Sequence, residues 1–339
     1  MIVHRLVRAC ALASIAIPSA LPATAADYTG RTINFIVGSA PGGGYDTYAR
    51  VFARHFGGHL PGKPVDNVQN MQTAGGLNAA NTIYNLAPKD GTTIGLFASS
   101  VALEPLLGNT LARFDTAKFN WLGNINRDAA SCGAWKTSGV TSIVDAEKRE
   151  IKFGASGLGA STAQHALFMK NTLGSKLRVI TGYGGTNDVK LAMQRGEADA
   201  SCGLFVSSVL GPYGNDVKSG DLKIIVQFGR KNDPAFNDAP NIYDLLKTQE
   251  DKQAADFVFL ASEITRPVTA PPGVSADVAA TLRKAFDDTV VNSEFLATAK
   301  AANILITPMN AKEVSQAFES FAAAPKAVIE RAKLAITTP

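Results

Sequence analysis

Short apolar runs alternate with segments of helical period over the first two thirds of the chain. Residues 32–37 form an apolar, β-branched run, and the pattern that follows places Tyr48, Phe52 and Phe56 on one helical face. The same succession predicts strands at 65–71, 92–98, 151–155, 177–181, 198–206 and 222–228, and helices at 77–86, 162–173 and 188–195. Strands that alternate with helices favour parallel sheets with helices on both faces, so the predicted fold class is α/β.

The last 70 or so residues have a different pattern, with helical periods at 276–291, 293–302 and 312–333 and little strand between them. A chain of 339 residues is long enough for two domains. We expect the chain to leave the first lobe near 125–135 and to return to it near 250–265. This assigns residues 26–127 and 256–339 to lobe 1 and residues 128–255 to lobe 2.

The N-terminus has the three parts of a secretory signal peptide. Arg5 and Arg8 precede an apolar stretch at 9–21, and the small residues at 23–25 form a cleavage site. We expect residues 1–25 to be removed and the mature protein to be periplasmic. The alternative is a buried N-terminal helix.

Composition excludes several classes of protein. Apolar residues make up 46% of the chain and charged residues 18%, as is ordinary for a globular protein. No apolar run after residue 30 approaches the roughly 20 residues that span a bilayer. The formal charge is only +4, with acidic residues between the basic ones, so we expect no nucleic-acid partner.

Two cysteines remain after the signal peptide, Cys132 and Cys202, and each lies in a Ser-Cys-Gly tripeptide that is typical of a strand. In an oxidising compartment they can form a disulfide. Closing a loop of this length would stabilise the fold by about 4 kcal/mol in the chain-entropy model. The alternative is two separate buried thiols.

Motifs for catalysis or metal binding are missing. The chain has no phosphate-binding P-loop, and Leu158 stands where a serine nucleophile elbow needs glycine. His55 and His59 have the i, i+4 spacing of metal ligands, but the glycines between them, Gly57 and Gly58, are expected to end the helix. We therefore expect no metal, no cofactor and no enzymatic activity.

Small-residue loops follow five of the predicted strands and lead into helices, at 39–47, 73–76, 98–100, 155–162 and 183–188. Such loops expose backbone N–H groups at the positive ends of helices, where anions bind. The alternative for each loop is an ordinary helix cap or turn. No Arg or Lys lies within these loops, so we expect an organic carboxylate held by main-chain nitrogens without a basic side chain.

The ligand should lie between the two lobes, beyond the carboxyl ends of the strands. Tyr45 and Phe205 are candidates for apolar walls or for core packing, and Asp46 is expected to cap its helix. The full set of candidate ligand-binding residues is Ser39, Ala40, Gly43, Gly44, Tyr45, Asp46, Thr73, Ser99, Ser156, Ser161, Thr162, Tyr183, Gly184, Gly185, Thr186 and Phe205.

Five segments carry a family resemblance. They are residues 37–46 (VGSAPGGGYD), 73–76 (TAGG) with 78–81 (NAAN), 88–93 (PKDGTT), 182–185 (GYGG) and 270–274 (APPGV). Together they resemble the Bug/TctC family of periplasmic solute-binding proteins, the receptors of tripartite tricarboxylate transporters. The resemblance implies a type II periplasmic binding protein, with two α/β lobes joined by two crossing segments and a ligand cleft between them.

The resemblance also implies a function. Family members bind small organic carboxylates and deliver them to membrane permease subunits of the transporter, and we expect this chain to act as a monomer. Gly182 and Gly184 depart from the family's Pro-Tyr-Lys-Gly type of loop. Two alternatives remain open: a ligand sensor for a membrane kinase or chemoreceptor, and a secreted serine hydrolase with His165 as base.

Overall fold

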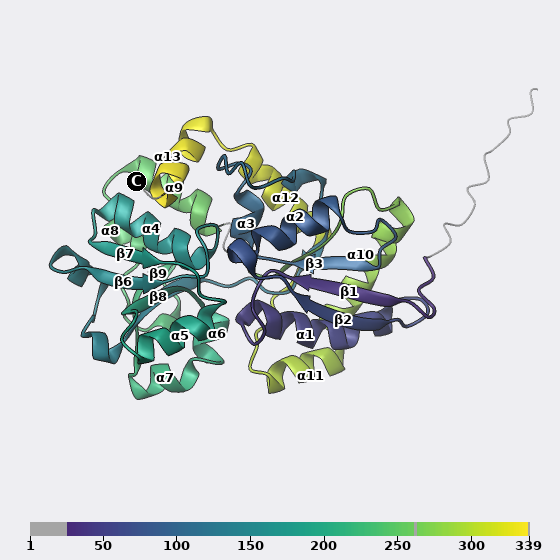
Figure 1. The fold of residues 1–339 in the computed structure, drawn as a ribbon, viewed down its shortest axis with the longest axis horizontal. Helices are drawn as coiled ribbons and strands as arrows, with labels where there is room; N and C mark the ends of the chain where they lie inside the picture. The colour runs from purple at the N-terminus through teal and green to yellow at the C-terminus, as the bar shows by residue number, and fades with distance from the viewer. Residues whose placement is uncertain (1–25, 261–262, 338–339) are drawn as a thin grey trace, which may run out of the picture.

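The computed structural model describes residues 26–260 and 263–337, and these form two α/β lobes that lie side by side (Figure 1). The predicted signal peptide lies outside the described residues. Within them, no helix is both long enough and apolar enough to span a bilayer.

Lobe 1 is built on a six-stranded sheet of order β11-β4-β10-β3-β1-β2. Its strands are β1 (Thr32–Val37), β2 (Val65–Asn70), β3 (Thr93–Leu96), β4 (Asn120–Asn124), β10 (Pro267–Ala270) and β11 (Met309–Asn310). Its helices are α1 (Gly44–Phe56), α2 (Leu77–Asn85), α3 (Ser99–Leu103), α10 (Ala276–Val291), α11 (Ser293–Ala301) and α12 (Ala311–Ala322). Helices α1 and α2 cover opposite faces of the sheet (Figure 1), and Phe35 packs edge-on against Phe52 and Phe56 beneath α1.

Lobe 2 is built on a five-stranded sheet of order β7-β6-β8-β5-β9. Its strands are β5 (Ala130–Trp135), β6 (Ile151–Gly154), β7 (Leu177–Ile180), β8 (Ala200–Phe205) and β9 (Leu222–Phe228). Its helices are α4 (Ser161–Leu173), α5 (Thr186–Gln194), α6 (Val206–Leu210), α7 (Gly214–Ser219), α8 (Ile242–Leu245) and α9 (Gln249–Ala255). Short helical turns lie at Gly57–His59, Thr73–Gly76, Thr116–Lys118, Lys136–Ser138, Ile143–Glu147, Pro234–Phe236 and Asp256–Leu260.

Both sheets are mixed, whereas the sequence pattern favoured parallel sheets. Strands β1, β2 and β3 are parallel, as are β6, β7 and β8. Strand β10 runs antiparallel to β3 and β4, and β5 runs antiparallel to β8 and β9. Strands β5 and β10 enter their sheets directly from the other lobe, without the helical crossover that parallel neighbours need.

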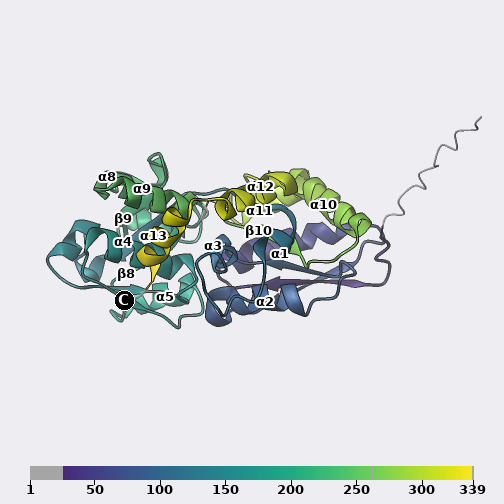
Figure 2. The same cartoon turned by 90° about the horizontal axis from the view of Figure 1, so that it is seen from above.

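The C-terminus divides between the lobes, which differs from the expectation that residues 256–339 belong to lobe 1. Helix α12 packs on β4, but α13 (Lys326–Ile336) packs on α4 and α9 of lobe 2 (Figure 2). Pro325 separates α13 from α12, because proline disfavours helix at the residue before it. The side chain of Asn171 in α4 then donates to the carbonyls of Leu334 and Ala335.

A disulfide joins Cys132 of β5 to Cys202 of β8, which confirms the predicted bridge. The two residues are direct partners in the antiparallel ladder, and both are fully buried. The bridge therefore links neighbouring strands inside lobe 2.

Candidate functional site

A cavity of about 60 Å³ lies between the lobes, where the carboxyl ends of the parallel strands face each other. It is lined by Gly38, Ser39, Gly43, Gly44, Tyr45, Gln72, Gly75 and Ala98 of lobe 1, by Ser156, Ala160, Ser161, Thr162, Gly184, Gly185, Thr186, Gly203, Phe205 and Ser208 of lobe 2, and by Arg266 of the second crossing segment. Main-chain nitrogens, hydroxyl groups and two aromatic rings thus surround one space.

Three helices begin at this cavity. Helix α1 starts at Gly44, α4 at Ser161 and α5 at Thr186, and all three residues line it. Their first N–H groups lack partners within the helix, and the three helix dipoles place partial positive charge at the same point. This arrangement favours an anion over a neutral ligand.

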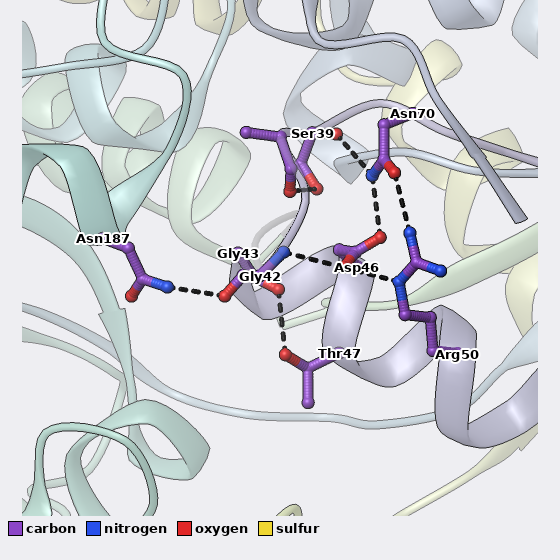
Figure 3. A network of polar contacts seen from close by, with 9 residues as sticks. Ser39, Gly42, Gly43, Asp46, Thr47, Arg50, Asn70 and Asn187 are labelled. Carbon is purple, nitrogen blue, oxygen red and sulfur yellow. Dashed lines mark hydrogen bonds and ion pairs between the residues drawn. The ribbon is translucent and has the colours of Figure 1, made fainter.

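The first loop is held in place by Asp46, whose side chain lies behind it (Figure 3). Its carboxylate accepts hydrogen bonds from the Gly42 amide at 2.8 Å, from Nδ2 of Asn70 at 2.8 Å and from Nε of Arg50 at 2.9 Å. Burial alone would raise the pKa of Asp46, but the hydrogen bonds from Arg50, Gly42 and Asn70 outweigh it and lower the pKa. The carboxylate thus stays ionised and fixes the turn that leads into α1.

Direct hydrogen bonds join the two lobes around the cavity. The Ala40 amide donates to the Gly184 carbonyl at 3.3 Å, and Nδ2 of Asn187 donates to the Gly42 carbonyl at 2.6 Å (Figure 3). Further along α4, Nε2 of Gln164 donates to Oε1 of the buried Glu104 of lobe 1 at 2.8 Å. The structure therefore has the two lobes closed on each other.

Two glycines permit this closure at the cavity wall. A Cβ atom on Gly157 would lie 2.8 Å from the Gly75 nitrogen and 3.0 Å from its Cα. Gly75 itself has a positive φ of 67°, a conformation that favours glycine. The backbones of the two lobes touch here because neither residue has a side chain.

Most of the predicted ligand-binding residues come together at the cavity. Those that line it are Ser39, Gly43, Gly44, Tyr45, Ser156, Ser161, Thr162, Gly184, Gly185, Thr186 and Phe205. Ala40, Asp46, Thr73, Ser99 and Tyr183 do not. Ala40 contacts the other lobe, Thr73 is exposed, Ser99 is buried at the start of α3, and the half-buried Tyr183 packs against the core of lobe 2.

Arg266 also lines the cavity, where we expected no basic side chain. It is only 2% exposed. Its guanidinium carbon lies 4.3 Å from the ring centre of Tyr45, 4.6 Å from that of Tyr48 and 5.2 Å from that of Phe205. Pattern reasoning missed Arg266 because it lies in a crossing segment, outside the glycine-rich loops.

Other lining residues were missed for a simpler reason. Gly38, Gln72, Gly75, Ala98, Ala160, Gly203 and Ser208 contribute mainly backbone or common polar groups. Gly203 has a positive φ of 71°, and a Cβ there would lie 3.1 Å from Oγ of Ser161. A glycine within a predicted strand is the one sequence signal that could have indicated this close approach.

The histidines are placed away from the cavity. His165 is fully buried against the rings of Phe228 and Phe259, and burial lowers its pKa to about 3. That position does not support the hydrolase alternative, which needs this side chain as a base. His55 contacts Oγ1 of Thr298, and the described residues contain no cluster of His, Cys, Asp and Glu that could hold a metal ion.

Comparison with known protein structures finds the same two-lobed fold. The chain is 18% identical to the periplasmic binding protein BugD, with a TM-score of 0.70 over 87% of this chain and 95% of that one. It is 18% identical to MatC from Rhodopseudomonas palustris with bound malate, with a TM-score of 0.70 over 89% and 99%. An R. palustris protein with adipate is 16% identical, with a TM-score of 0.69 over 90% and 98%.

Comparison with curated protein sequences finds no match. Family models give a clear result, because residues 49–334 match the tripartite tricarboxylate transporter family receptor, TctC. That match covers most of the chain and includes both lobes. Together with the fold of two mixed α/β lobes, it shows that the chain belongs to the TctC family of solute-binding receptors.

Proposed function

We propose that this protein is a periplasmic solute-binding protein that captures a small organic carboxylate between its lobes and delivers it to the membrane permease subunits of a tripartite transporter. The observation that carries the proposal is the convergence of three helix N-termini on one interlobe cavity. An anion satisfies N–H groups at these ends that have no partner within the helices.

The chemistry of the lining favours a carboxylate. Ser39, Ser156 and Thr162 add hydroxyl donors, whereas Tyr45 and Phe205 provide apolar walls. The volume of about 60 Å³ limits the ligand to a small molecule. Two structural neighbours are known with malate and with adipate, and both compounds are carboxylates.

Ligand screening by melting temperature, followed by calorimetry, tests this proposal. The panel contains acetate, benzoate, succinate, malate, adipate and citrate, together with the neutral amides of the first two acids. At a hundredfold excess over Kd, a bound acid stabilises the protein by about 2.7 kcal/mol. We expect at least one acid to raise the melting temperature and the amides to have no effect; a panel without any shift would contradict the proposal.

Two glycine variants locate the binding site. Gly43 lines the cavity, and Gly43→Leu should abolish the ligand-induced shift while the unliganded protein still folds. Gly58→Leu is the matched control, because a Cβ on Gly58 meets nothing within 4 Å. Undiminished binding by Gly43→Leu would place the ligand elsewhere.

A further inference from the structure

Arg266 is a buried, charged residue in the second crossing segment. Its main chain is fixed independently of its side chain: the amide donates to Oδ1 of Asn124 at 2.7 Å, and the carbonyl accepts from the Ile125 amide at 3.0 Å. Both partners belong to lobe 1 and the first crossing segment. The backbone of Arg266 is therefore fixed where the two crossing segments meet.

Few hydrogen-bond acceptors within the described residues satisfy this guanidinium. Nη1 donates to the Thr265 carbonyl at 2.8 Å and the guanidinium also contacts the Tyr45 hydroxyl, whereas Nε is buried without a hydrogen-bond partner. Arg266 forms no ion pair with any described carboxylate. A buried charge without a counter-ion is costly, and an anion that reaches it gains correspondingly.

Asp128, whose carboxylate interacts electrostatically with Arg266, is already hydrogen-bonded to other groups. Asp128 is buried and accepts hydrogen bonds from the Ser207 amide at 2.9 Å and from Nδ2 of Asn126 at 3.1 Å. Burial raises the pKa of Asp128, and the positive charge of Arg266 acts in the opposite direction. Asp128 thus offsets the charge only at a distance, which leaves the guanidinium available to a ligand.

The rings around Arg266 hold its guanidinium at the interface between the lobes. Tyr45 and Tyr48 belong to α1 of lobe 1, whereas Phe205 ends β8 of lobe 2. Besides the first cavity, Arg266 also lines a neighbouring interlobe cavity of about 160 Å³, which contains Tyr213 and Asn303. A ligand bound in either of these two cavities would therefore contact the side chain of Arg266.

We propose that the planar donors of Arg266 bind the carboxylate of the ligand directly, so that the site combines helix N-termini with one buried charged anchor. This proposal rests on the proposed function. Rings from both lobes contact the guanidinium, and a carboxylate bound there would stabilise the closed state specifically. A guanidinium can donate two parallel hydrogen bonds to a carboxylate, which an ammonium group cannot.

Calorimetry with the six acids of the screening panel tests the anchor in four proteins. They are the wild type, Arg266→Met, Arg266→Lys and the control Arg127→Gln, which removes an exposed arginine from the first crossing segment. For the acid that the wild type binds most tightly, we expect Arg266→Met to weaken affinity at least a hundredfold and Arg266→Lys about tenfold. Arg127→Gln should leave the affinity within twofold of the wild type.

Melting temperatures without ligand separate the anchor from a structural role. Because Met removes a buried, unpaired charge, we expect unliganded Arg266→Met to melt no lower than the wild type. A folded Arg266→Met or Arg266→Lys variant with wild-type affinity would overturn the anchor. If Arg266→Met does not fold, the Lys variant decides the question by the same criterion. A wild type that binds none of the six acids of the screening panel would instead count against the proposed function.

Discussion

Asp46 shapes the ligand site without lining it. Its carboxylate accepts hydrogen bonds from the Gly42 amide and from the side chain of Asn70, which would otherwise donate to water. Arg50, one turn further along α1, pairs with the same carboxylate. The position of the Gly43 and Gly44 nitrogens therefore depends on a charge that lies on the far side of the loop.

Removing this carboxylate should loosen the loop. Hydrogen bonds to a charged group contribute about 1.5–3 kcal/mol each, so we expect Asp46→Ala to lower the unfolding free energy by at least about 2 kcal/mol. Carboxylate affinity should fall about tenfold, because the amides of the loop lose their fixed orientation. Chemical denaturation and calorimetry measure the two effects, and a variant with unchanged affinity would show that Asp46 does not position the loop.

The acid dependence of stability provides a second test of Asp46. Its pKa in the folded protein is below the unfolded value of about 3.9, so its stabilisation is fully present above that value. The stabilisation is lost as the pH falls through the lower, folded-state pKa. Melting curves between about pH 2 and 5 should show this acid loss in the wild type and a smaller loss in Asp46→Asn, whereas parallel profiles would contradict it.

At the scale of residues, the sequence predicted the loops that line the cavity but not the buried arginine, Arg266. Glycine, serine and threonine before a helix have a local meaning, so Gly43, Ser161 and Thr186 could be predicted as lining residues. Arg266 has no such local signal, because its role depends on three aromatic rings from two lobes. Only the assembled structure brings those rings together.

At the scale of elements, the disulfide joins strands whose pairing is already complete. Cys132 and Cys202 face each other in the ladder between β5 and β8, so the native strands do not need the bridge to meet. In the chain-entropy model its main effect is on the unfolded chain, where it closes a loop with a sequence separation of 70.

Removing both cysteines should therefore destabilise lobe 2 while leaving its ligand contacts in place. We expect Cys132→Ala/Cys202→Ala to lower the unfolding free energy by about 4 kcal/mol, or less where the unfolded chain stays compact. Urea denaturation of the oxidised wild type, the reduced wild type and the double variant measures this difference. Equal stability of all three proteins would contradict the stabilising role.

Local pattern predicted most elements, and the exceptions have physical causes. Strand β1 and helix α10 have the predicted bounds, because a β-branched run and a capped amphipathic segment are local features. The single helix expected at 312–333 is two helices, α12 and α13, separated at Pro325. Strand β4 was not predicted, because its five residues derive their stability from β10 and β11 on either side.

At the scale of the whole molecule, closure depends on backbone contact between the lobes. Gly157 lies against Gly75, and Gln164 donates to Glu104, so the segment that leads into α4 contacts lobe 1 at two points. Closing over a ligand removes water from these hydrogen bonds and strengthens the electrostatic interactions within the site. A small obstacle at this contact should therefore affect binding more than folding.

Gly157→Ala provides that obstacle. The backbone of Gly157 has no positive φ, so alanine is tolerated within lobe 2, but its Cβ would lie 2.8 Å from the Gly75 nitrogen across the interface. We expect the unliganded melting temperature to stay within about 2 °C of the wild type, because each lobe still packs. Affinity should fall at least about tenfold, a loss of about 1.4 kcal/mol.

Gly58→Ala is the control, since it adds the same methyl group where nothing lies within 4 Å. Calorimetry with the acid that the wild type binds most tightly compares the two variants. If Gly157→Ala bound that acid as tightly as Gly58→Ala, ligand binding would not require the lobes to close at this point.

A crystal structure of the wild type with the acid bound most tightly in calorimetry tests the central claim most directly. We expect electron density for its carboxylate between the first residues of α1, α4 and α5, within hydrogen-bond distance of main-chain nitrogens from both lobes. A ligand found on the outer surface, or held by one lobe alone, would contradict the account.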